Sequence, residues 1–324
     1  LETFMEDYHN LVLLRPMQLG KTTLFSLAEL VFSKNKKCPD GLKYEPPEDL
    51  KNACFVLRVD FGAVNADCEG TKTWEEVGRK LDRSAYMEIE RAINSFLNAH
   101  KDVEKVFRRT TPVASDCNSG QLLENLAGAV KSIKADAVLL ILVDEYDAPM
   151  REILLEMLEE KGRPLADNIL NTETRLRRAY PQYITFFKAC KTISSILPNT
   201  KTWLTGITPL DLPHLSRFIP TVVTFHSDLT DVVGLRDADV DHMLDQVHNY
   251  NSFKDDDEKA RVRAAIKEHY NGLMFLSGDG LYHTRLVNSV MNGLLSDPER
   301  QEWLQDLTKP MASVLVAKCP SSVF

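Results

Sequence analysis

The feature that most restricts the fold of this chain is an uninterrupted apolar run, Ala137–Val143 (AVLLILV), that ends in two carboxylates, Asp144 and Glu145. A strand that is apolar at every position is typical of a parallel sheet that is covered by helices on both faces. A sheet with one face in water would alternate apolar and polar residues instead. The run therefore predicts an α/β protein with a parallel sheet at its centre.

Four more segments are predicted to be strands because they are short, rich in β-forming residues and bounded by breakers: 12–14, Phe55–Phe61, Lys201–Gly206 and Thr221–Phe225. Helical spacing of apolar residues fills the intervals, at Leu24–Phe32, Trp74–Ala99, Gln121–Ile133, Met150–Leu158 and Ile184–Leu197. This alternation predicts a five-stranded parallel sheet flanked by helices, with right-handed crossovers.

The pattern changes beyond Gly234, where strand candidates stop. Four helical patterns follow one another, at Asp239–Val247, Asp256–Tyr270, Thr284–Leu295 and Pro298–Leu307. We therefore expect a core domain over residues 1–230 and a C-terminal helical lid, or helical subdomain, over residues 231–324.

The segment between the first strand and the first helix, Arg15–Thr22 (RPMQLGKT), resembles a phosphate-binding loop. Gly20 allows the backbone to approach phosphate oxygens, Lys21 would reach the β- and γ-phosphates, and the Thr22 hydroxyl would be a ligand of Mg²⁺. Arg15 stands where the first glycine of the motif belongs, so a helix start with a basic residue is the alternative. The residues expected to contact the nucleotide are Arg15, Pro16, Met17, Gln18, Leu19, Gly20, Lys21, Thr22 and Thr23.

The carboxylates after the apolar run form a Walker B arrangement, because both emerge at the carboxyl end of a buried strand, where open α/β sheets bind ligands. We expect Asp144 to hold Mg²⁺ and Glu145 to polarise the attacking water. The alternative is a helix N-terminus with surface acids, capped by Asp147. The presence of Lys21 and of a strand between the two motifs favours nucleotide binding.

That extra strand is typical of P-loop NTPases of the additional-strand, catalytic-glutamate type, in which the fourth strand lies between the two motif strands. Thr205, at the end of the fourth strand, is the candidate sensor of the γ-phosphate; a β-forming threonine before a turn glycine is the alternative. Arg217 could supply positive charge to the same phosphate, although a surface arginine explains it as well. The predicted catalytic residues are thus Glu145, Lys21 and Thr205.

These motifs resemble the AAA-ATPase-like domain family of predicted P-loop ATPases, related to the STAND and archaeal ATPases. The family's Asp-Glu-Tyr-Asp-x-Pro motif is complete at Asp144–Pro149, its Arg-Pro phosphate loop matches Arg15–Thr23, and its Leu-Thr-Gly element matches Leu204–Gly206. His269–Gly272 is similar to the family's Tyr-Asn-Gly signature, though a helix C-cap is the simpler reading. The form of the loop resembles fungal members, some of which accompany Crinkler-type effectors.

Two family features are not found in this sequence. The Asp-Lys-Thr segment that precedes the first strand in the family is absent, which leaves base and ribose contacts unassigned. No acidic-lysine strand pattern of a PD-(D/E)xK nuclease-like domain follows the ATPase region. The resemblance covers residues 11–275 and implies ATP and Mg²⁺ as cofactors.

Charge and composition narrow the class of partner. The formal net charge is −8, from 39 Lys and Arg against 47 Asp and Glu, so the net charge does not support nucleic acid as a partner. No apolar run is long enough to span a bilayer. Six scattered cysteines without a C-x-x-C pair indicate reduced thiols and an intracellular protein, cytoplasmic or nuclear.

The sequence therefore predicts an ATP hydrolase whose cycle moves the helical lid. The alternative is a nucleotide-dependent binding switch or scaffold with little turnover, within a nucleic-acid-processing or effector protein. Intact Lys21, Thr22, Asp144 and Glu145 favour the enzyme. No Asn-Lys-x-Asp motif for guanine is present. The biological process, an arginine finger, an unidentified protein partner and a homo-oligomeric state are left open.

Overall fold

The computed structural model describes residues 1–38, 46–47, 50–64, 74–111, 117–151, 181–210, 212, 216–229, 231–249, 253, 255–274 and 280–296. The chain divides into two compact units. The first unit joins Leu1–Arg15 to Thr22–Val223 and contains the large sheet, and the second joins Pro16–Lys21 to Thr224–Phe324. The predicted boundary at residue 230 remains a prediction, since this division falls at Val223.

The first unit is built on a five-stranded sheet in which every neighbouring pair is parallel, as predicted. Its strands are β1 (Asn10–Leu14), β2 (Phe55–Asp60), β3 (Leu139–Asp144), β4 (Thr200–Gly206) and β5 (Thr221–Val222). Their order across the sheet is β2-β3-β4-β1-β5, so β4 lies between β1 and β3. The strand predicted over Thr221–Phe225 is confirmed only for its first two residues.

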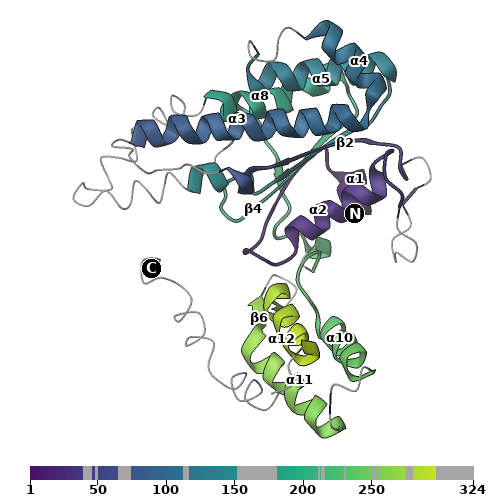
Figure 1. Cartoon of the computed structure of the whole chain (residues 1–324), viewed down its shortest axis with the longest axis vertical. Coiled ribbons are helices and arrows are strands. Elements are labelled where there is room, and N and C mark those ends of the chain that lie inside the picture. Colours follow the sequence, from purple (N-terminus) through teal and green to yellow (C-terminus); the bar gives the residue numbers. More distant parts are fainter. Residues whose placement is uncertain are drawn as a thin grey trace. The chain divides into compact units, whose positions relative to one another are not determined.

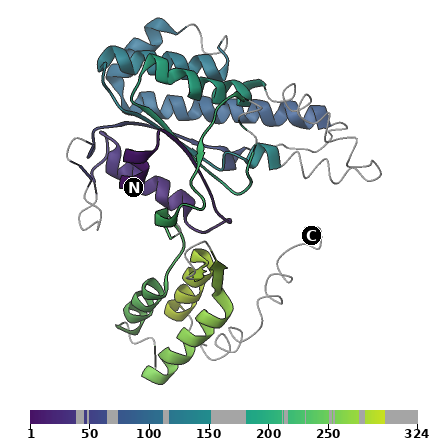
Figure 2. The ribbon, with the colours of Figure 1, turned by 180° about the vertical axis from the view of Figure 1, so that it is seen from behind.

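Helices cover both faces of the sheet, as the apolar run predicted. One face carries α3 (Trp74–Ala99), α4 (Lys101–Thr110), α5 (Ser119–Ile133) and α8 (Pro181–Ile196), and the other carries α1 (Glu2–Asp7) and α2 (Lys21–Phe32) (Figures 1 and 2). All six residues of β3 are buried between these layers. On the face of α1 and α2, Trp203 is fully buried with Phe4 and Phe32 against its ring. Of the helix predicted over Met150–Leu158, residues 152–158 lie outside the described part.

The ends of the helices follow local sequence signals. Asn118 and Gln121 form a capping box at the start of α5, in which each side chain bonds the backbone amide of the other. The start of α8 is capped from another helix, because Oδ1 of the buried Asp82 on α3 accepts the amides of Gln182 (3.0 Å) and Tyr183 (3.1 Å). This contact fixes α8 against α3.

The second unit contains α10 (Asp237–Asn249), α11 (Asp256–Tyr270) and α12 (Thr284–Ser296), which confirm three of the four predicted helices (Figure 1). The fourth, Pro298–Leu307, lies outside the described residues. Between α10 and β5 lies one short 3-10 segment, Ser227–Leu229. The apolar faces of the three helices pack into a separate core with Tyr282.

The second unit is not purely helical, contrary to the prediction. An antiparallel pair, β6 (Asn271–Met274) and β7 (Gly280–Tyr282), connects α11 to α12. The predicted glycine cap after Tyr270 is also wrong: Asn271 is extended (φ −88°, ψ 145°), and Gly272, with φ 140°, lies inside β6. The chain passes directly from helix to strand there. At the other end of α11, Asp255 caps the helix by accepting the Glu258 amide at 2.7 Å.

Within the described ranges, no helix has both the length and the apolar composition that a membrane-spanning helix needs.

Candidate nucleotide site

The predicted phosphate loop begins where β1 ends. The amide of Arg15 continues the pairing with β4 by donating to the carbonyl of Gly206 at 3.1 Å. The Arg15 side chain is 1% exposed, its Nη1 donates to the carbonyl of Leu14 at 3.0 Å, and burial lowers its pKa to about 10. The arginine that replaces the first glycine of the motif therefore packs into the protein at the strand end, which accounts for a large residue at that position.

The loop itself turns through two residues with positive φ, Gln18 (62°) and Gly20 (105°). A φ of 105° strongly favours glycine, which explains the one glycine that the loop retains. Lys21, the first residue of α2, folds back so that its Nζ donates to the carbonyl of Pro16 at 2.8 Å. The Lys21 side chain, which is predicted to contact phosphate, thus binds the backbone of its own loop. The exposed side chains of this region are those of Pro16, Met17, Gln18, Thr22 and Thr23.

Leu19 anchors the loop to the rest of its unit. Its side chain is fully buried, and its carbonyl accepts the Gly234 amide and the Thr284 hydroxyl, both at 3.0 Å. Thr284 is the first residue of α12. The backbone of the predicted phosphate loop is therefore tied directly to the C-terminal helices, a contact that the sequence did not suggest.

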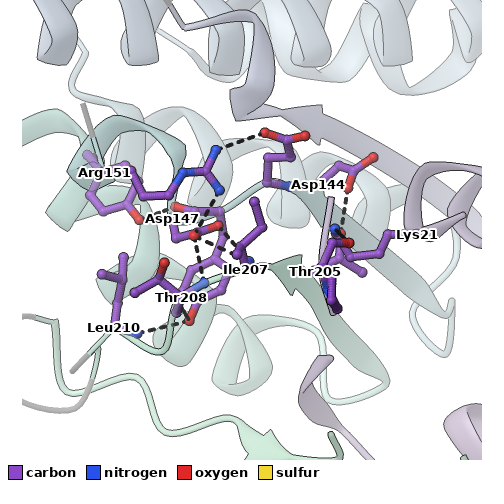
Figure 3. Close-up of polar contacts among 12 residues, drawn as sticks. Lys21, Asp144, Asp147, Arg151, Thr205, Ile207, Thr208 and Leu210 are labelled. Atoms are coloured by element: carbon purple, nitrogen blue, oxygen red, sulfur yellow. Dashed lines mark hydrogen bonds and ion pairs between the residues drawn. The ribbon is translucent and has the colours of Figure 1, made fainter. Parts of the chain in front are cut away.

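Asp144 ends β3 as predicted and is 1% exposed. Its Oδ1 accepts the Thr205 hydroxyl at 2.5 Å and the Glu145 amide at 3.2 Å, whereas its Oδ2 is buried without a hydrogen-bond partner (Figure 3). The predicted sensor, Thr205, thus orients this carboxylate from the neighbouring strand. A buried carboxylate oxygen that lacks a donor is suited to a cation, directly or through water.

The donor set fits Mg²⁺ bound together with a nucleotide. Mg²⁺ in such sites is usually held by one or two protein oxygens, substrate phosphates and water. In the described part of the chain, no group of three or more His, Cys, Asp or Glu side chains could hold a metal ion. Asp144, and the exposed hydroxyl side chain of Thr22 at the start of α2, are the residues that would hold the ion.

An arginine that was not predicted lies beside Asp144. Arg58, on β2, places Nη2 at 3.7 Å from Asp144 Oδ2 and at 3.4 Å from the Thr22 carbonyl, to which it donates. The sequence signal is a basic residue in the middle of a largely apolar strand, which pairs with the motif strand. The alternation of Phe55–Phe61 indicates only that this position lies on the more polar face of the strand.

Glu145 adopts an unusual backbone conformation, with φ 47°, which is uncommon outside glycine and recurs at functional sites. Its side chain is 34% exposed, and Oε2 lies 3.2 Å from Nη2 of Arg151. On another side the carboxylate lies close to Gly62, where an added Cβ would come within 3.2 Å of Cδ of Glu145. The predicted catalytic carboxylate is accessible and is held by an arginine.

Asp147 is fully buried and joins the end of β3 to the loop after β4. Its carboxylate accepts the amides of Ile207 (3.2 Å) and Thr208 (2.8 Å) and pairs with Arg151 at 3.1 Å (Figure 3). The hydroxyl of Tyr146 spans the same two segments: it donates to the Thr208 carbonyl (3.0 Å) and accepts the Leu210 amide (3.1 Å). Burial raises the pKa of Tyr146 to about 12.

Gly206 explains why the Leu-Thr-Gly element accompanies the Asp-Glu-Tyr-Asp motif. A Cβ at this position would lie 2.5 Å from Oδ1 of Asp147 and 2.6 Å from the Tyr146 ring. Only glycine lets the two segments approach this closely. Glu145 and Asp147 share Arg151, Tyr146 and Asp147 bind the segment after β4, and Thr205 binds Asp144, so the two motifs form one polar network (Figure 3).

Comparison with known families identifies the family of this chain. The family described as Predicted AAA-ATPase (AAA-ATPase-like) matches residues 2–216, well over half of the chain. The chain belongs to this family. No curated protein and no solved structure matches it. The match covers the phosphate loop, the Asp-Glu-Tyr-Asp motif and the end of β4, and confirms the resemblance drawn from those residues.

Arg217, the other candidate for contact with phosphate, lies just beyond the family match. It is exposed and has a left-handed backbone (φ 60°). Its position therefore agrees with the alternative that Arg217 is a surface arginine.

Proposed function

We propose that the chain binds ATP with Mg²⁺ and hydrolyses it, as a P-loop NTPase of the additional-strand, catalytic-glutamate type. The strand order carries this proposal: β4 lies between β1, which leads into the phosphate loop, and β3, which ends in Asp144 and Glu145. Both ends of the loop and both carboxylates thereby belong to the carboxyl edge of one parallel sheet, where such sheets bind ligands. The membership of the predicted AAA-ATPase family supports a nucleotide as that ligand.

The phosphates would be held by the loop. Backbone amides at the start of α2 provide donors and the positive end of the helix dipole, and Lys21 would leave the Pro16 carbonyl to reach the β- and γ-phosphates. Asp144 and Thr22 would hold Mg²⁺, which when bound neutralises charge that develops on the phosphates. The Thr205 hydroxyl keeps the Asp144 carboxylate in one orientation.

Glu145 would accept a proton from the attacking water. Its side chain is accessible and its backbone is fixed by hydrogen bonds on both sides: the Glu145 amide donates to Asp144, and its carbonyl accepts the Ala148 amide at 2.9 Å. The Glu145 carboxylate also accepts a hydrogen bond from Arg151. To contact the attacking water, the carboxylate must therefore leave Arg151 or move together with it.

The ion pair with Arg151 is also the observation that favours a second function. If Glu145 stays paired when nucleotide is bound, the chain would bind ATP with little turnover and act as a switch or scaffold. In either case the hydrogen bonds from Thr284 and Gly234 to the carbonyl of Leu19 support a coupling of the C-terminal helices to the loop. We propose that residues 231–324 act as a helical lid for this reason.

Two substitutions separate binding from hydrolysis. Lys21→Ala removes the point charge on the phosphates and should abolish stabilisation by Mg²⁺-ATP in a thermal-shift titration. Glu145→Gln keeps the loop, Lys21 and the metal ligands, so ATP affinity should stay close to wild type while kcat falls by at least ~100-fold, the range of general-base help.

The outcomes of these experiments distinguish an ATP hydrolase from a nucleotide-dependent switch, and both from a protein that does not bind ATP. Equal stabilisation of wild type and Lys21→Ala by ATP would refute the phosphate loop. Unchanged kcat in Glu145→Gln would refute the general base. Binding of ATP by wild type without turnover would favour the switch.

A further inference from the structure

Arg58 is a charged residue inside the sheet whose role the proposed function does not explain. Its side chain is 23% exposed and extends from β2 toward α2 and the end of β3. Nη1 donates to the hydroxyl of Ser26 at 2.8 Å, and Nη2 donates to the carbonyl of Thr22 at 3.4 Å. The guanidinium thus lies between Thr22 and Asp144, the two residues that would hold Mg²⁺.

Arg58 compensates the negative charge of Asp144 without forming a hydrogen bond to the carboxylate oxygen Oδ2. Nη2 lies 3.7 Å from Asp144 Oδ2, which is ion-pair distance but too long for a hydrogen bond, and Oδ2 has no other hydrogen-bond partner. An ionised carboxylate that is 1% exposed is strongly unfavourable unless a cation lies near it. Arg58 supplies that cation and leaves the acceptor oxygen unoccupied.

The other acidic neighbour of Arg58, Glu29, has a second basic partner. Glu29, on α2, lies 3.6 Å from Nη1 of Arg58, but it already has a closer partner in Lys36 at 2.8 Å. Arg58 lies at a similar distance from both carboxylates, but among the described residues it is the one side chain that forms an ion pair with Asp144. Its hydrogen bonds to Ser26 and Thr22 hold it in that position.

We propose that Arg58 is the resident counter-cation of the metal site, which compensates Asp144 in the metal-free protein and sets how strongly a divalent cation is bound there. This inference rests on the proposed function in one respect, that Asp144 is the metal ligand. Mg²⁺ that binds at Asp144 must do so against the positive charge of Arg58 or displace that side chain. Removal of the charge should therefore strengthen Mg²⁺ binding rather than weaken it.

An anchoring role for Arg58 gives the opposite expectation. If its bonds to Ser26 and Thr22 only fasten α2 to β2, a substitution lowers stability by the same amount with and without Mg²⁺. The two roles are therefore separated by the Mg²⁺ dependence of stability, not by stability itself.

The test is thermal unfolding of the full chain without nucleotide, as a function of MgCl₂ at constant ionic strength. From the shift in Tm, Arg58→Met should bind Mg²⁺ about 10-fold more tightly than wild type, which is about 1.4 kcal/mol. For a divalent ion and a unit charge about 4 Å apart, Coulomb's law gives more than this, both in water and near a protein surface. The expected gain is therefore set low, as suits a partly exposed side chain. Arg58→Lys keeps the charge and should bind Mg²⁺ as weakly as wild type.

Two further variants show whether the effect belongs to this site. Arg91→Met removes an arginine that is 69% exposed and pairs with Glu88 on α3, and it should leave the Mg²⁺ response unchanged. Adding Asp144→Asn to Arg58→Met should abolish the gain. Equal Mg²⁺ responses in wild type and Arg58→Met, or a gain that persists in the double variant, would overturn the proposal. Either result leaves ATP binding through Lys21 to be judged by its own titration, so the two proposals fail separately.

Discussion

Replacement of Asp147 by alanine should disrupt the polar network that joins the two motif strands and lower the free energy of unfolding. Asp147 is fully buried, and its carboxylate accepts the Ile207 and Thr208 amides and pairs with Arg151 at 3.1 Å. Alanine leaves both amides without this acceptor and leaves Arg151 with Glu145 at 3.2 Å. The side chain that is lost therefore carries the connection between the end of β3 and the loop after β4.

The expected loss of stability follows from these contacts. A buried donor that loses its acceptor costs about 1–3 kcal/mol, and removal of one partner from a buried ion pair costs about 3–5 kcal/mol. The terms overlap, and Arg151 keeps Glu145 and is 23% exposed, so we expect a total of about 3–4 kcal/mol. Domains have unfolding free energies of about 5–15 kcal/mol, so this is a large fraction of the whole.

Urea unfolding followed by far-UV circular dichroism measures the loss, with separate transitions fitted separately because two units need not unfold together. Asp136→Ala is the matched control, an exposed aspartate shortly before β3, and should change stability by less than about 0.5 kcal/mol. A loss below about 1 kcal/mol for Asp147→Ala would show that the buried carboxylate is not what joins the two segments.

Two further predictions concern other buried contacts. Burial raises the pKa of Asp82 from 3.8 to about 6, so its stabilising contribution is complete below pH 3.8 and is lost as the pH rises through 6. Between pH 7 and pH 5, urea unfolding should therefore show wild type gaining about 1 kcal/mol more than Asp82→Asn, and parallel pH profiles would contradict this. Thr284→Val removes the hydroxyl that bonds the Leu19 carbonyl, so ATP affinity in the thermal-shift titration should fall about 5-fold. Thr192→Val, in the other unit, should leave the affinity unchanged. An unchanged ATP affinity in Thr284→Val would refute the proposed coupling of the C-terminal helices to the loop.

The sheet could be predicted because the pattern that indicates each strand lies within a short stretch of sequence. A short unbroken apolar run that is rich in β-forming residues favours a strand buried on both faces, and the residues that follow such a strand lie at its carboxyl end. Asp144 and Thr205 are predicted in the same way to lie at one edge of the sheet. The bond between them at 2.5 Å then follows from β3 and β4 being neighbours.

Contacts that depend on side-chain reach could not be predicted in the same way. Arg58 and Arg151 read as polar positions of a strand and a helix, and nothing in their spacing shows that each lies beside a motif carboxylate. The strands β6 and β7 were missed because three or four residues are too few to show alternation. The connection from Thr284 to Leu19 joins residues 265 positions apart, and no local pattern records it.

Three carboxylates within four residues have different roles here because they have different partners. Asp147 is saturated by amides and an arginine, so its charge serves the fold. Asp144 is equally buried but keeps Oδ2 without a donor, so its charge is available to a cation. Glu145 is one-third exposed on a strained backbone, so its carboxylate can act outside the network. Neutralising each in turn should therefore affect three different measurements: unfolding free energy for Asp147, the Mg²⁺ response for Asp144, and turnover for Glu145. If all three amide variants changed only stability, the motif would be a structural junction, and the proposed chemistry would have to be assigned elsewhere.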